Sequence, residues 1–116
     1  MTEQASDAIV VFMTAASTEE ASHIAETLVE KGLAACVQIL PGMQSVYRWK
    51  GEVEKQAEIL ILAKTVKSKF GELETEVRAL HSYETPEIVA APISNGSTPY
   101  LEWLSASVES SRRSEL

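Results

Sequence analysis

The longest feature of the sequence is residues 33–65, which read as one two-stranded hairpin. Its second arm, residues 52–65, would span roughly 45 Å at about 3.3 Å per residue, well beyond an ordinary strand. The helix predicted before the hairpin, residues 18–31, would be only about 21 Å long at about 1.5 Å per residue. We therefore expect part of the ribbon to project beyond its own subunit.

The hairpin also carries many apolar side chains for a projecting element. An open apolar edge of this kind promotes aggregation unless another chain pairs with it, and the simplest partner is a second copy. We therefore predict a homo-oligomer. The residues concerned are Val46, Tyr47 and Trp49 on the first arm and Ile59, Leu60, Ile61 and Leu62 on the second.

The first half of the chain predicts a strand, a helix and the hairpin. Residues 8–14 form a continuous apolar run typical of a central, buried strand. Ser17 followed by Glu20 is a capping-box pattern for the helix over 18–31, which Gly32 would end. Within the hairpin, Pro41 and Gly42 predict a bulge or bend, and Lys50 and Gly51 predict a two-residue turn.

The second half predicts two helices separated by a strand. Helical spacing returns over residues 67–80, and residues 87–93 read as a last strand whose Pro92 places its end near a sheet edge. Thr98 as N-cap and Pro99 at the first helical position begin a terminal helix. We expect residues 1–7 and 110–116 to fray.

This order predicts the α+β class: a ferredoxin-like βαββαβ sandwich with an extra C-terminal helix, formed by residues 1–116 as a single domain. Right-handed crossovers place both crossover helices on one face of the sheet. The opposite face then needs a cover, which either the third helix or neighbouring subunits must provide. This is a second argument for an oligomer.

Composition excludes several partners. With 17 acidic and 10 basic residues, the net charge of −7 repels phosphate backbones and anionic membranes, so we expect neither nucleic acid nor membrane as a partner. No apolar run approaches the roughly 20 residues of a membrane span. The single cysteine, Cys36, excludes an internal disulfide, and no secretory signal is visible, so we expect a cytoplasmic location.

Few residues suggest chemistry. Cys36 reads as a small buried hydrophobe, and His23 as a solvated surface residue. His81 closes the second helix, where an imidazolium would meet the helix dipole favourably; the alternative is a metal ligand. The sequence contains no intrachain metal motif, so any site would be assembled across strands or subunits. An enzyme has least support, because no nucleophile, base and oxyanion group can be named together.

Aromatic and charged residues leave two interpretations open. The aromatic side chains could line a ligand pocket, but they are also typical of protein interfaces. Lys64, Glu84 and Glu87 lie close to core segments, where a salt-bridged or solvated strand end competes with a small-molecule site. The aromatic residues are Tyr47, Trp49, Tyr83, Tyr100 and Trp103.

Taken in order, the segments LAACVQILPG, SVYRWKGEVE, ILILAKT, HSYETPEIVAAPI and YLEWL resemble the CutA divalent-cation-tolerance family over nearly the whole chain. The resemblance implies a ferredoxin-like subunit in a tight homotrimer, a cytoplasmic location, and a role in tolerance to copper and other divalent ions. We therefore predict a non-enzymatic homotrimeric binding protein of the metal-ion response.

The resemblance also implies site residues. Copper-binding relatives place a cysteine late in the first strand and two histidines before the Tyr-x-x-Pro-Glu segment; here these positions are Met13, Leu80 and His81. Thioether and imidazole are acceptable Cu(I) ligands, so His81 and Met13 are the metal-ligand candidates, for copper or another divalent ion.

The fold is also similar to that of the nitrogen-regulatory PII proteins, which bind effectors in clefts between subunits. By this analogy the alternative function is a signalling or scaffold trimer that binds a small metabolite or a protein partner. The candidate lining residues of its intersubunit cleft are Trp49, Lys64, Tyr83 and Glu84.

Overall fold

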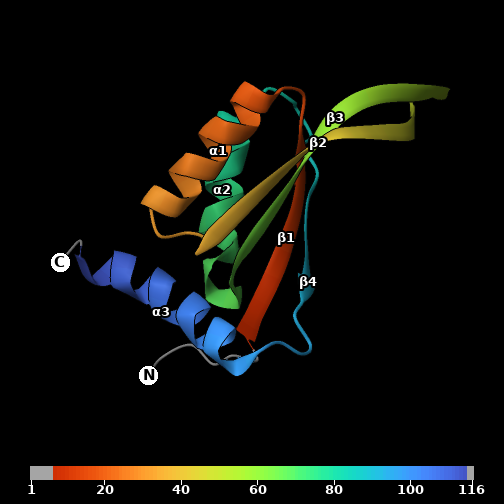
Figure 1. The fold of residues 1–116 in the computed structure, drawn as a ribbon. Coiled ribbons are helices and arrows are strands. Elements are labelled where there is room, and N and C mark those ends of the chain that lie inside the picture. Colours follow the sequence, from red (N-terminus) through yellow and green to blue (C-terminus); the bar gives the residue numbers. More distant parts are fainter. Residues whose placement is uncertain (1–6, 115–116) are drawn as a thin grey trace.

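A computed structural model describes residues 7–114, with side chains to residue 108. It confirms the predicted order of elements and the α+β ferredoxin-like class (Figure 1). The elements are β1 (Ala8–Ala15), α1 (Thr18–Glu30), β2 (Cys36–Trp49), β3 (Glu52–Val66), a 3₁₀ turn η2 (Lys67–Lys69), α2 (Phe70–Leu80), β4 (Ile88–Pro92) and α3 (Thr98–Ser114).

The four strands form one antiparallel sheet in the order β2-β3-β1-β4, so β1 is central as predicted. Strand β4 lies at one edge, which agrees with the predicted position of Pro92 near a sheet edge. Helices α1 and α2 cover one face (Figure 1). The apolar core lies between that face and the two helices, because alternate strand residues point to the same side. Its fully buried members include Val11, Met13, Ile24, Leu28, Ile61, Leu73 and Val77.

Helix α1 begins and ends where its sequence signals predict. The hydroxyl of Ser17 accepts a hydrogen bond from the Glu20 N–H at 3.1 Å, which caps the N-terminus. At the other end Gly32 has a φ of 71°, and the Leu33 N–H donates to the Leu28 carbonyl at 2.9 Å. This left-handed glycine turns the chain out of the helix and into β2.

The predicted bulge and turn of the hairpin are confirmed. The β2–β3 register shifts between Leu40 and Met43, with Gly42 at a φ of 91°, and the two-residue turn has φ values of 52° at Lys50 and 84° at Gly51. Because Leu40 pairs with Leu60 and Met43 pairs with Glu58, two β2 residues oppose one β3 residue.

The bulge decides which face the aromatic residues of the hairpin take. Met43 pairs with Glu58, so the alternation that follows puts Tyr47 and Trp49 on the same side as Glu58 and Gln56. That side is continuous with the sheet face opposite α1 and α2, which we call the open face.

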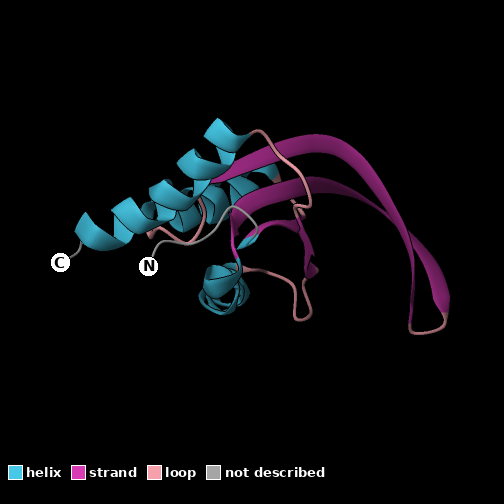
Figure 2. Ribbon diagram, turned by 90° about the horizontal axis from the view of Figure 1, so that it is seen from below, coloured by secondary structure: helices cyan, strands magenta, loops and turns pink. Residues whose placement is uncertain are grey.

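The ribbon projects as its length predicts. Figure 2 shows the two hairpin arms running past the helices and curling away from them, and the subunit measures 48 × 30 × 22 Å. At the projecting end Val46 is 59% exposed and Val53 is 63% exposed. In one subunit these apolar side chains therefore have no cover.

Helix α3 covers only the end of the open face farthest from the ribbon tip (Figure 1). Leu101, Leu104 and Val108 form a second buried cluster with Ala8 and Val66. The rest of the open face stays accessible, with Leu40 61% exposed and Val89 52% exposed. The part of the chain that the structure describes has no helix both long and apolar enough to cross a membrane.

Several predicted boundaries differ from the structure. The hydroxyl of Ser97, rather than Thr98, accepts from the Tyr100 N–H at 3.3 Å, so the cap of α3 lies one residue earlier than predicted. The helix predicted over 67–80 starts as the 3₁₀ turn η2, and the strand predicted over 87–93 is limited to Ile88–Pro92. Helix α3 extends to Ser114. The fraying expected of residues 1–7 and 110–116 stays a prediction, and residues 1–6, 115 and 116 lie outside the described residues.

Candidate functional site

His81 is the C-cap of α2, and its side chain turns inward toward β1. The imidazole is fully buried, with Nε2 2.7 Å from the Thr14 carbonyl oxygen. On the other side of the ring, the Tyr83 N–H donates to Nδ1 at 3.0 Å. Because Nδ1 accepts this hydrogen bond, Nε2 is the ring nitrogen that donates to the Thr14 carbonyl. The ring joins α2 to β1, a role different from the expected meeting of an imidazolium with the helix dipole.

Glu20 fixes the segment that follows His81. Its carboxylate accepts from the Ser82 N–H at 2.7 Å and from the Ser82 hydroxyl at 3.1 Å. Burial raises the pKa of Glu20, but the hydrogen bonds from Ser82, together with the nearby His81 and the Ala16 N–H, outweigh it and leave this pKa below its usual value. The first turn of α1 is thereby joined to the end of α2.

A chain of polar side chains continues from Tyr83 onto the ribbon. The Tyr83 hydroxyl donates to Glu58 Oε2 at 2.8 Å and accepts from the Gln56 amide at 3.0 Å. The Tyr47 hydroxyl donates to the Gln56 side-chain oxygen at 2.7 Å. Burial, together with the hydrogen bond to Glu58 and the charge of that carboxylate, raises the pKa of Tyr83 to about 12.

These residues lie at one side of a cleft of about 500 Å³ between the ribbon and the loop that precedes β4. Three of the predicted cleft residues, Trp49, Tyr83 and Glu84, line it together. The remaining lining residues are Thr14, Ser45, Val46, Tyr47, Gln56, Glu58, Thr85 and Glu87.

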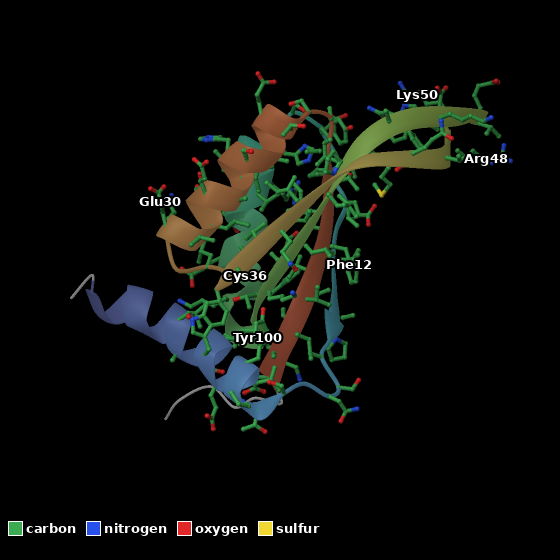
Figure 3. The ribbon with its side chains drawn as sticks, viewed as in Figure 1. Phe12, Glu30, Cys36, Arg48, Lys50 and Tyr100 are labelled. Atoms are coloured by element: carbon green, nitrogen blue, oxygen red, sulfur yellow. The ribbon has the colours of Figure 1, made fainter. Side chains whose placement is uncertain are left out.

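Lys64 does not line this cleft within one subunit, and its place in a cleft between subunits stays a prediction. Lys64 pairs with Cys36 near the base of the hairpin, whereas Trp49 pairs with Glu52 beside the turn. The ammonium of Lys64 donates to the Gln38 side-chain oxygen at 2.6 Å and lies 5.7 Å from the centre of the Tyr100 ring. In Figure 3, Cys36 and Tyr100 mark that region, far from Lys50 at the ribbon tip.

Within one subunit, the two metal-ligand candidates are already engaged in other contacts. Met13 is fully buried in the apolar core, and both ring nitrogens of His81 already have hydrogen-bond partners. An ion at His81 would have to displace either Thr14 or the Tyr83 N–H. Within residues 7–114 no three His, Cys, Asp or Glu side chains come together in a group that could hold a metal ion.

The exposure of His23 and Cys36 is close to that predicted from the sequence. His23 is exposed on α1, and Cys36 is partly buried at the start of β2. The remaining aromatic pair, Tyr100 and Trp103, stacks on α3 with ring centres 5.5 Å apart. The aromatic residues therefore divide between the cleft and α3 and do not form one surface.

Sequence reasoning missed Glu58, Gln56 and Thr14. Glu58 is only 7% exposed, and the one signal that could have identified it is a carboxylate directly before the apolar run of β3. Glu20 was recognised as part of a cap, but no pattern in the sequence indicates its contact with Ser82, which is 62 residues away.

Comparison with known proteins gives a consistent family match. The family model described as CutA1 divalent ion tolerance protein matches residues 9–107. The chain is similar to the divalent-cation tolerance protein CutA of Thermus thermophilus, with 53% identity over 95 residues, which are 82% of this chain and 92% of that protein. It is also similar to the chloroplastic protein CutA of Arabidopsis thaliana, with 45% identity over 83% of this chain and 53% of that protein. The solved structure of the divalent cation tolerance protein from Thermus thermophilus has a TM-score of 0.85 and 50% identity, covering 86% of this chain and 97% of that chain.

Proposed function

Because this chain belongs to the CutA1 divalent ion tolerance family, we propose that it takes part in tolerance to divalent metal ions as a homotrimer without catalytic activity. The name of the Thermus thermophilus relative supports the physiological role. The shape of the subunit supports the proposed homotrimer.

The proposed homotrimer is supported above all by the exposed apolar surface of the open face and the ribbon. Leu40, Val46, Val53 and Val89 are each between 52% and 63% exposed. Fully burying a valine or leucine side chain is worth about 1.5–3 kcal/mol, so each of these residues has about 1 kcal/mol left to gain from a partner. Helix α3 is already packed on Ala8 and Val66 at the other end of the face, so copies of this chain are the proposed cover.

Sedimentation velocity at micromolar concentration tests the assembly. We expect a trimer for the natural sequence and dissociation for the double variant Leu40→Asp/Val89→Asp, because two carboxylates would be buried at each contact. The matched control is Val29→Asp, since Val29 is 42% exposed on α1 and lies away from the open face. A stable, soluble monomer of the natural sequence would remove the proposal.

A copper ion or another divalent ion at His81 and Met13 stays a prediction. The contacts of the two residues disfavour it within a subunit, so we propose that divalent ions act on the assembled protein without a resident ion at His81. Titration of Cu(I), Cu(II) and Zn(II) into the natural sequence and into His81→Gln separates the alternatives. Equal binding by both proteins supports our proposal. Loss of a stoichiometric ion in a folded His81→Gln variant would instead assign the ligand role to His81.

A cytoplasmic location also stays a prediction. The Arabidopsis thaliana relative is named as a chloroplastic protein, so the family name does not specify a compartment.

A further inference from the structure

The connection between β4 and α3 contains the only asparagine of the sequence. Asn95 is followed directly by Gly96, and both residues are exposed in a segment, residues 93–97, that forms neither helix nor strand. The segment lies at the end of the subunit away from the ribbon tip (Figure 1). It contains none of the exposed apolar residues that support the proposed homotrimer, so nothing in that proposal removes it from water.

No hydrogen bond holds the two groups of this pair that could react with each other. Across residues 7–108, neither the side-chain amide of Asn95 nor the N–H of Gly96 has a hydrogen-bond partner. The amide can therefore rotate toward the next peptide group, and the nitrogen of that peptide group is free to react. Asparagine is among the thermolabile residues of proteins.

Packing explains why a glycine occupies position 96. A Cβ added there would lie 3.1 Å from side-chain carbons of Leu101, which is only 8% exposed. A larger residue would therefore press on the side chain that packs α3 against Ala8 and Val66. The same lack of a Cβ leaves the Gly96 nitrogen unhindered and its backbone adaptable. The residue that the packing requires is thus also the neighbour that makes Asn95 most reactive.

We propose that Asn95 is a site of spontaneous deamidation in the folded protein. The Gly96 nitrogen, after losing its proton to hydroxide, forms a bond to Cγ of Asn95. The bond from Cγ to Nδ2 breaks, and the amide nitrogen leaves as ammonia after taking a proton from water, which leaves a succinimide ring. Water then opens this ring. Addition at Cγ gives aspartate, whereas addition at the main-chain carbonyl gives isoaspartate, in which the chain runs through Cβ and Cγ.

The two products should affect α3 differently. The Ser97 hydroxyl accepts from the Tyr100 N–H at 3.3 Å, and the Ser97 carbonyl accepts from the Leu101 N–H at 3.0 Å. An aspartate at position 95 keeps the main chain unchanged and puts a negative charge near the positive end of the helix. Isoaspartate adds a carbon to the main chain directly before Gly96, which displaces Gly96 from Leu101. We therefore expect isoaspartate, and not aspartate, to loosen α3 from the end of the sheet.

Incubation of the whole protein in mildly alkaline buffer, followed by peptide mass mapping, tests the site. We expect the peptide with Asn95 to gain the mass of an amide-to-acid exchange, while glutamine-containing peptides stay unchanged because their side chains must close a larger ring. The rate should fall about tenfold for each pH unit, because the deprotonated fraction of the Gly96 nitrogen falls by that factor. Asn95→Gln should abolish the gain, and this variant keeps the contact of Gly96 with Leu101. Retention of Asn95 in the folded protein, while the denatured chain is converted in the same buffer, would overturn the proposal.

A second measurement separates the two products. Enzymatic methylation of isoaspartate identifies the molecules with the lengthened main chain, and thermal unfolding compares them with Asn95→Asp at the same protein concentration. Asn95→Asp is the matched control, because it carries the same charge without the extra main-chain carbon. We expect the isoaspartate form to unfold at a lower midpoint than this variant. Equal midpoints would overturn the proposed effect on α3.

Discussion

Replacing His81 by alanine tests whether this residue holds the fold together without any metal. The substitution removes a fully buried ring and both of its hydrogen bonds, at 2.7 Å to the Thr14 carbonyl and at 3.0 Å from the Tyr83 N–H. Each buried group left unpaired costs about 1–3 kcal/mol, and the lost ring adds a cavity cost. We expect the free energy of unfolding to fall by about 3–5 kcal/mol.

The assay is equilibrium denaturation by guanidinium chloride in the presence of EDTA. The natural sequence and the variant must be compared at the same protein concentration, because self-association contributes to apparent stability. His23→Ala is the matched control, since His23 is exposed on α1 and surface substitutions usually change stability by less than about 0.5 kcal/mol. If His81→Ala were as stable as His23→Ala in EDTA and weaker only with added metal, the structural role argued here would be wrong.

Three further predictions concern a carboxylate, a phenol and a glycine. Glu20→Gln should lower the free energy of unfolding by about 1–2 kcal/mol at pH 7. Because folding lowers the pKa of Glu20, the stabilisation by its carboxylate is present above the unfolded pKa and is lost as pH falls through the folded pKa. The denaturation curves of the two proteins should therefore converge in acid. Of the three tyrosines, Tyr83 should ionise last, at about pH 12, in a titration followed by ultraviolet absorbance, and the late step should be absent in Tyr83→Phe. Stability that depends on Tyr83 should fall as pH rises from about 10 to about 12, since its pKa is raised on folding. Gly42→Ala should cost about 1–2 kcal/mol through backbone strain alone, because φ is 91° and a Cβ would meet nothing within 4 Å; unchanged thermal stability would contradict this reasoning.

The fold was predictable because its main signals are local. The N-cap at Ser17, the left-handed Gly32 and the turn at Gly51 act within a few residues, and each is found where the sequence predicts it. The Glu20 carboxylate of the predicted capping box accepts from Ala16 and Ser82. The cap of α3 was misplaced for a local reason as well. Ser97 and Thr98 are both good caps, and the pattern does not show which hydroxyl will meet the free N–H groups.

The site was less predictable because its contacts join distant segments. Trp49, Tyr83 and Glu84 were placed in a cleft between subunits by analogy, and within one subunit they line one cleft. Lys64 was placed with them, but strand pairing puts it at the opposite end of the hairpin. Analogy between folds transfers the position of a cleft between elements, but the register of this particular hairpin decides which side chains reach it.

The bulge connects the shape of the subunit to the chemistry of the cleft. Without the extra residue at Pro41 and Gly42, the alternation along β2 would place Tyr47 and Trp49 on the face opposite Glu58. The cleft would then keep its carboxylates and lose the two ribbon aromatics. The same register shift therefore turns the aromatic side of the ribbon toward the charge of Glu58. The length of the hairpin makes the ribbon project, and one irregularity in strand pairing gives the acidic cleft its aromatic side chains.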